Sequence, residues 1–172
     1  MINTKFNLAL ALMMCNLLPT VTQAVCRDDI TPSTPDSRFT INNDGTVTDL
    51  QTDLMWMQCS LGQVWEGGEC VGDISTFSWS GALSEAQSYS FIGYDDWYLP
   101  NIKQLASIVE QACDSPAVNE TIFPNTSSNT YWSSSPYAYS DGSAWYINFR
   151  NSGDGSYDKS NDEHVRLVRA GQ

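Results

Sequence analysis

The sequence predicts an α+β domain in which two short helices pack on small antiparallel sheets and disulfide bonds staple the layers together. Three observations lead to this prediction: apolar residues recur at helical spacing in two mid-chain segments, alternating strand patterns flank them, and the chain holds five cysteines. Of the 172 residues, 41% are hydrophobic and only 16% are charged. This composition is typical of one packed globular domain.

Residues 1–24 are expected to form a secretory signal peptide. Lys5 is their only charge, residues 8–15 are apolar, and Thr22-x-Ala24 precedes the expected cleavage point. The apolar run is shorter than the roughly 20 residues that a membrane span needs. Cleavage leaves 148 residues (172 − 24) and moves the net charge from −12 to −13, because Lys5 is lost. We therefore expect a periplasmic or extracellular protein with no membrane insertion.

The cysteines that remain after cleavage are even in number, as expected of an exported protein: Cys26, Cys59, Cys70 and Cys113. Three pairings are open. A Cys59–Cys70 bridge would close a short loop with a glycine pair, and by elimination Cys26 would then join Cys113 at the end of a helix. A metal or redox site is the weaker interpretation, because the chain has no C-x-x-C motif and a single histidine.

The mature chain divides into an extended arm, residues 25–37, and one domain, residues 38–172. Alternating patterns predict strands at 38–42, 46–49, 54–57, 131–135, 145–149 and 165–169. Asn43-Asp44-Gly45 supplies the turn of the first hairpin. A first helix should begin at Ser80, with Ala82, Leu83 and Ala86 inward, and a second at Asn101, with Leu105, Ile108, Val109 and Ala112 inward.

The last third of the chain holds the candidate binding surface. Residues 151–163 contain no aliphatic side chain and consist mainly of Tyr, Ser, Gly, Asn and Asp, which are typical of binding loops. A solvated loop between two strands is the alternative. Because the polar side of the preceding strand carries Tyr146, Asn148 and Arg150, strand and loop could form one continuous face. The candidate ligand-binding residues are Tyr137, Tyr139, Asp141, Tyr146, Asn148, Arg150, Asp154, Tyr157 and Asp158.

Five motifs follow one another along the domain: Asp44-Gly45-Thr46-Val47-Thr48-Asp49, Leu54-Met55-Trp56, Gly93-Tyr94-x-Asp96-Trp97-x-Leu99-Pro100-Asn101, Tyr131-Trp132-Ser133-Ser134-Ser135 and Val165-Arg166-Leu167-Val168-Arg169. In order and spacing they resemble the Lcl C-terminal domain family over residues 38–169. The resemblance implies a C-type-lectin-like fold, related to that of formylglycine-generating enzymes and used for adhesion and glycan binding. Physics assigns the motifs structural roles first, and we expect Trp97, Leu99 and Trp132 in the core.

The charge restricts the partners. Twenty acidic residues against eight basic ones would repel nucleic acid, and they also argue against a polyanionic glycan. The expected partner is a cell-surface glycan or protein: a neutral glycan, or a protein surface with exposed basic groups.

No catalytic motif is present, and the only histidine, His164, is more typical of a structural or solvated residue. We therefore expect a binding protein and not an enzyme. A small secreted enzyme of the formylglycine-generating type, which would need reactive cysteines, and a structural envelope protein without a small ligand are the alternatives.

No cofactor is expected. Calcium is the one candidate, because hard oxygen ligands gather late in the chain at Asp141, Asp154, Asp158, Asp162 and Glu163. Neither the motifs of calcium-dependent lectins nor the EF-hand spacing occurs, so solvated acidic residues are expected there and no metal site is predicted.

Overall fold

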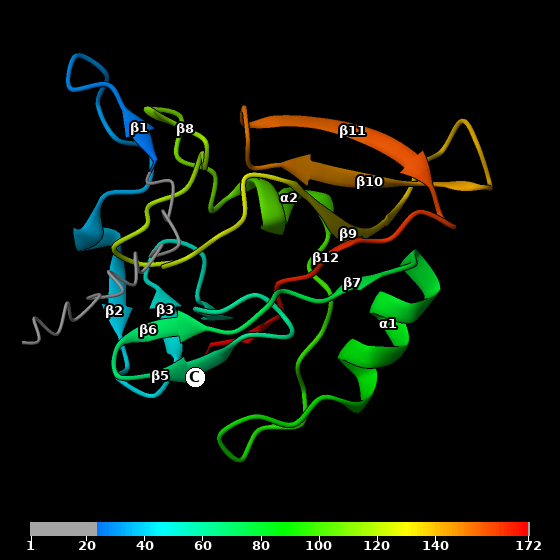
Figure 1. Cartoon of the computed structure of the whole chain (residues 1–172), viewed down its shortest axis with the longest axis horizontal. Coiled ribbons are helices and arrows are strands. Elements are labelled where there is room, and N and C mark those ends of the chain that lie inside the picture. Colours follow the sequence, from blue (N-terminus) through cyan, green and yellow to red (C-terminus); the bar gives the residue numbers. More distant parts are fainter. Residues whose placement is uncertain (1–23, 172) are drawn as a thin grey trace, which may run out of the picture.

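The structure is a computed structural model that describes residues 24–171. Apart from Ala24, the predicted signal peptide lies outside these residues. The fold is α+β with mostly strands, few helices and small sheets, as predicted (Figure 1). The helices are α1 (Trp79–Ser88), α2 (Ile102–Ala106) and the 3-10 turn η1 (Asp36–Arg38).

Thirteen short strands form four sheets in the described chain. They are β1 (Val25–Cys26), β2 (Phe39–Ile41), β3 (Thr46–Asp49), β4 (Leu54–Met57), β5 (Val64–Glu66), β6 (Glu69–Val71), β7 (Thr76–Phe77), β8 (Cys113–Asp114), β9 (Thr130–Pro136), β10 (Ser143–Asn148), β11 (Gly153–Asp158), β12 (Glu163–His164) and β13 (Val168–Ala170). The largest sheet has the order β11-β10-β9-β12-β7, and the second has the order β13-β4-β3-β2. All pairings are antiparallel except that of β12 with β9.

Local signals predicted several elements correctly. The hairpin of β2 and β3 turns at Asn43 and Gly45, whose φ angles of 61° and 90° lie in the region that such a turn needs. Asn101 caps α2 in a capping box with Gln104. Trp97, Leu99 and Trp132 are buried as predicted.

The helix boundaries differ from the prediction. Ser78, and not Ser80, caps α1, so Trp79 lies within the helix, where its indole nitrogen donates to the Ser133 carbonyl. The second helix ends at Ala106, although Ile108, Val109 and Ala112 beyond it are buried. Apolar residues continue at helical spacing beyond Ala106, but the helix has ended, and the carboxylate of Glu110 binds the N-terminal arm (residues 25–37).

The strand prediction is wrong in two segments. The expected loop 151–163 contains β11, which pairs with β10 from Ser143 to Asn148. The expected final strand 165–169 is not one strand: β12 joins the five-stranded sheet, a buried connection follows, and β13 joins the four-stranded sheet. The last residues therefore connect the two main sheets.

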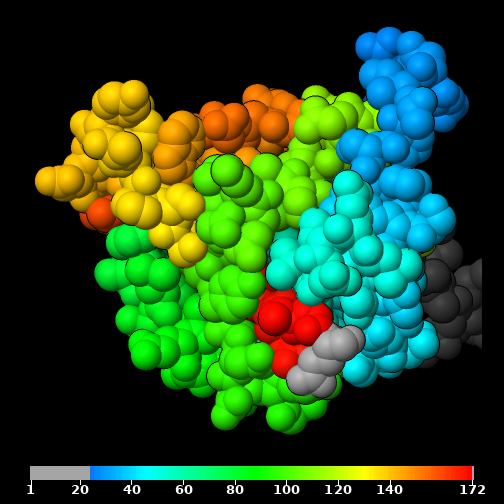
Figure 2. Space-filling model, turned by 180° about the vertical axis from the view of Figure 1, so that it is seen from behind, coloured from blue at the N-terminus to red at the C-terminus, as the bar shows by residue number. Residues whose placement is uncertain are grey.

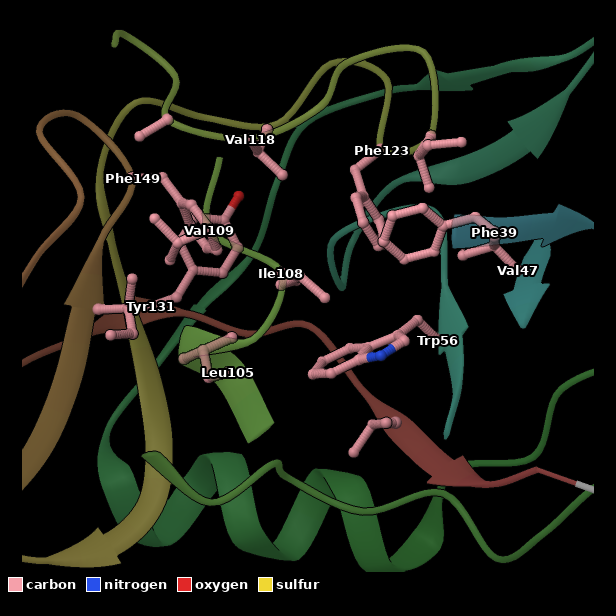
Figure 3. Packing of buried hydrophobic residues seen from close by; sticks show 14 residues of the cluster. Phe39, Val47, Trp56, Leu105, Ile108, Val109, Val118, Phe123, Tyr131 and Phe149 are labelled. Carbon is pink, nitrogen blue, oxygen red and sulfur yellow. The ribbon is translucent and has the colours of Figure 1, made fainter. Parts of the chain in front are cut away.

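Two buried clusters form the core. The first lies between α2 and the sheets and includes Phe39, Trp56, Leu105, Phe123 and Tyr131 (Figure 3). The second lies on the other face of the five-stranded sheet and includes Trp132, Ala144 and Ala82 of α1. The two helices therefore cover opposite faces of this sheet.

Two arginines of the last family-like motif hold the C-terminal segment. Arg166 is fully buried. Its guanidinium donates to the carbonyls of Met57 and Gln58 and to the hydroxyls of Ser60 and Thr126. Burial lowers the pKa of Arg166 to about 10, so it stays charged at neutral pH. Arg169 donates to both carboxylate oxygens of Asp96, at 2.7 and 3.0 Å.

The N-terminal arm is fixed by a disulfide and by one carboxylate. The predicted pairs Cys26–Cys113 and Cys59–Cys70 are confirmed, although Cys113 lies in β8, paired with β1, and not at a helix end. Glu110 accepts hydrogen bonds from the amides of Ser33, Thr34 and Ala112. Burial acts to raise the pKa of Glu110, but these donors outweigh it and the pKa is lowered.

The Arg166→Met variant should lose about 3–5 kcal/mol of unfolding free energy, because it leaves buried carbonyls and hydroxyls without their donor. Urea denaturation of the wild-type and variant proteins measures this loss. Arg150→Met is the matched control, since Arg150 is exposed, and it should stay within about 0.5 kcal/mol of wild type. An Arg166→Met variant as stable as the control would contradict the anchoring role.

Candidate binding surface on the C-terminal hairpin

The nine predicted contact residues lie in strands β10 and β11 or in the segments that join β9, β10 and β11. Directly paired residues of antiparallel strands share a face, so the register assigns each side chain to one side of the sheet. We call the side that carries Trp132, Ala144 and Tyr146 the α1 face, and the side that carries Tyr131 and Ile147 the α2 face, after the helices that cover them.

Three aromatic side chains form a cluster at the tip of the β9–β10 hairpin. The ring centroids of Tyr137 and Trp145 are 5.0 Å apart in an edge-to-face arrangement, and those of Tyr137 and Tyr139 are 5.5 Å apart. Tyr139 is 89% exposed. We call Tyr137, Tyr139 and Trp145 the aromatic tip; the segment that carries Tyr137 and Tyr139 projects from the molecule (yellow, Figure 2).

Tyr146 and Tyr157 form a second aromatic pair, on the α1 face. Their ring centroids lie 4.2 Å apart, and each ring stands opposite a small residue of the neighbouring strand, Gly155 or Ala144. A Cβ atom at Gly155 would meet the Tyr146 hydroxyl at 2.6 Å. The Tyr146 ring therefore needs glycine at position 155.

A row of polar groups runs across four strands beside this pair. Glu163 of β12 accepts a hydrogen bond from the Thr130 hydroxyl, Thr130 pairs with Asn148, and Asn148 pairs with Gly153. The side chains of this row carry a carboxyl, a hydroxyl and a carboxamide, and the row ends at a glycine. We call Glu163, Thr130, Asn148 and Gly153 the polar row.

Two ionisable groups on this face have raised pKa values. Burial, with a smaller contribution from Asp162, raises the pKa of Glu163 to about 7. Burial and the neighbouring Tyr157 also raise the pKa of Tyr146. His164 points to the other face, stacks on Tyr131 and has its pKa lowered by burial, so it is neutral at pH 7.

The predicted contact residues do not form one continuous face. Tyr146, Asn148 and Tyr157 lie on the α1 face; Asp154 lies on the α2 face, beside Ile147 and Lys103, in a hollow of about 340 Å³. Tyr137, Tyr139 and Asp141 belong to the tip, and Arg150 is exposed at the β10–β11 turn. Asp158 accepts hydrogen bonds from Ser160, which lower its pKa.

Trp145 is a contact candidate that the sequence prediction missed. Alternation placed it inward with Ile147 and Phe149, which are indeed buried. Trp145 belongs to neither core cluster, is only half-buried, and packs on Tyr137. Pairing of the strands predicted at 131–135 and 145–149 could have identified Trp145 as a contact candidate, because pairing across the turn brings Trp145 beside Tyr137.

Two larger hollows lie away from the hairpin. One, of about 650 Å³, separates the arm near Arg27 and Pro32 from Val118 and Glu120. The other, of about 670 Å³, lies between the Cys59–Cys70 loop and residues 125–129. In the described chain, no group of three or more His, Cys, Asp or Glu side chains is placed to hold a metal ion.

Fold and surface together define a small, doubly disulfide-bonded α+β domain that presents an aromatic and acidic hairpin. The chain belongs to the Lcl C-terminal domain family, whose model matches residues 45–169. No curated protein matches the chain. The family match confirms the resemblance that the five motifs predicted.

Two properties bear on location. The disulfides indicate an oxidising compartment outside the cytoplasm. Between Ala24 and Gly171, no helix has the length and apolar character that crossing a membrane requires.

The raised pKa of Glu163 predicts a pH-dependent stability. The folded state binds the proton of the Glu163 carboxyl more tightly than the unfolded chain does, so protonation of Glu163 stabilises the fold. This contribution to the unfolding free energy is fully present below about pH 4.5 and is lost as pH rises through about 7. Glu163→Gln cannot ionise, so its stability relative to wild type should rise between pH 5 and pH 8. With solvent screening of this partly exposed group, the gain is about 1 kcal/mol, or about 2–4 °C in Tm.

Thermal unfolding of wild type and variant at the two pH values measures this gain. The matched control is Glu69→Gln, at an exposed position of β6. A Tm difference between Glu163→Gln and wild type that is the same at pH 5 and pH 8 would show that Glu163 does not titrate in this range.

Proposed function

We propose that this chain is an exported binding or adhesion module that contacts a glycan or protein surface through its C-terminal hairpin, on a C-type-lectin-like fold. The observation that carries the proposal is the aromatic tip. Exposed tyrosine and tryptophan side chains are typical of binding surfaces, because they offer a large contact area at a low cost in conformational entropy.

Packing does not account for the aromatic tip. Tyr139 is the most exposed large apolar side chain of the described residues, and its ring contacts Tyr137, which in turn contacts Trp145. The three rings therefore extend from a half-buried tryptophan to a fully accessible tyrosine. This geometry suits contact with a partner that lies outside the molecule.

The charge of the hairpin selects among partners. Asp141 lies at the tip, and Asp154 and Asp158 are exposed on β11. Of the nearby cations, Lys159 is directed to the ring of Trp79 and to the Asp141 carbonyl, Lys103 lies beside Asp154 on the α2 face, and Arg150 is exposed at the β10–β11 turn. A neutral glycan or a protein surface with basic groups fits this surface. A polyanionic glycan would be repelled.

The cysteines distinguish this proposal from the enzymatic alternative. A formylglycine-generating type of chemistry would need reactive thiols. In the part of the chain that the structure describes, all four cysteines are paired in disulfides. The hairpin instead offers contact groups, and we propose a binding role for it.

Tyr139→Ala should weaken binding about tenfold or more, because it removes the ring that reaches farthest from the fold. The measurement is a binding screen of the mature protein against immobilised neutral glycans, heparin and intact cell surfaces. Leu50→Ala removes another exposed apolar side chain, 59% exposed and on the β3–β4 turn, and should leave binding unchanged. Equal binding by wild type and Tyr139→Ala would place the contact surface elsewhere.

A further inference from the structure

We propose that the α1 face of the hairpin holds a second binding site, separate from the aromatic tip, for the ring of a neutral sugar. The site consists of the Tyr146–Tyr157 pair and the polar row. It rests on the proposed function for the neutral-glycan ligand class but does not depend on the tip, because the aromatic tip and this site are formed by different residues.

On this face, glycine occupies the two positions where β11 would otherwise present side chains, and neighbouring side chains lie over both. Gly153 stands opposite Asn148 and Gly155 opposite Tyr146. Neither glycine has a positive φ, so the backbone conformation does not require glycine at these positions. A Cβ atom at Gly155 would meet the Tyr146 hydroxyl at 2.6 Å, and one at Gly153 would meet the Asn151 side-chain oxygen at 3.1 Å, so the missing side chains let the Tyr146 ring lie over β11.

The two tyrosines provide the apolar contact. Tyr146 packs partly on the second core cluster, which fixes its orientation, while Tyr157 remains 37% exposed. Aromatic faces of this kind contact the C–H face of a sugar ring and bury apolar area there. The fixed Tyr146 ring and the accessible Tyr157 ring beside it together offer a surface on which a sugar ring can lie.

The polar row provides the hydrogen bonds. One carboxylate oxygen of Glu163 is engaged by Thr130, whereas the other has no hydrogen-bond partner among residues 24–171. The Asn148 oxygen accepts from the Arg150 amide, and its side-chain nitrogen has no partner in the same range. One acceptor and one donor therefore face solvent beside the rings, which matches the hydroxyl groups of a sugar.

The electrostatics favour a neutral ligand. An anion would meet Glu163 and Asp162, and Asp154 is close enough to affect Tyr146. A cation would need an ionised Glu163, but its pKa of about 7 leaves that carboxyl about half protonated at neutral pH. A sugar hydroxyl can bind the carboxyl in either state.

Titration of the ¹⁵N-labelled mature protein with D-galactose, D-mannose, D-glucose and N-acetyl-D-glucosamine tests the proposal. At least one sugar should shift the amide signals of Gly153 and Gly155 saturably. Gly155→Ala should weaken that sugar at least tenfold, because the added Cβ displaces the Tyr146 ring without removing a polar group. Gly142→Ala is the matched control, since its Cβ would meet no atom closer than 3.9 Å, and it should change the affinity less than twofold.

The same titration separates this site from the aromatic tip. Tyr139→Ala should keep the sugar-induced shifts even where it loses surface binding. Absence of shifts with all four sugars, shifts that survive in Gly155→Ala, or shifts lost in Tyr139→Ala would each overturn the second site. The proposed function fails instead if Tyr139→Ala binds surfaces as wild type does, whatever the sugars show.

Discussion

The buried guanidinium of Arg166 holds the segment that joins the two main sheets. In the described chain it has no carboxylate partner, and carbonyl and hydroxyl groups from residues 57–60 and 126 hold it, with the Phe123 ring 4.9 Å away. An uncompensated buried cation is costly unless every surrounding dipole is in place. The segment that carries Arg166 also leaves the five-stranded sheet as β12 and enters the four-stranded sheet as β13. Its position therefore sets the relation of the two sheets.

The residues that hold the fold together differ from those of the proposed contact surface. Arg169 and Asp96 join the last motif to the motif before α2, and Trp132 and Ser133 join β9 to β7 and α1. The residues that make the family recognisable thus hold the fold together. Glu163 lies three residues before Arg166, so the anchor also positions the carboxyl of the polar row. Ala144 and Ile147 of β10 are buried in the two core clusters, whereas the aromatic tip of the β9–β10 hairpin belongs to neither cluster and is free to meet a partner.

Sequence patterns predicted what local chemistry decides. The Asn43–Gly45 turn, the Asn101 cap and the Cys59–Cys70 loop each depend on a few adjacent residues. Strand β11 was missed because Gly153–Asp158 has no aliphatic residue, and it forms only because β10 offers a partner and Tyr146 fills the space over Gly155. Alternation separated Trp145 from Tyr146 correctly. It could not tell which is accessible, because helices cover both faces of this sheet and the coverage ends where each helix ends.

We propose that partners meet the hairpin and not the larger hollows elsewhere on the molecule. Amide hydrogen exchange of the protein, with and without the strongest binder from the surface screen, tests this most directly. We expect slower exchange within residues 136–163 and unchanged exchange in the arm and in residues 110–129. Slower exchange in the arm or beside the Cys59–Cys70 loop, with the hairpin unaffected, would contradict it.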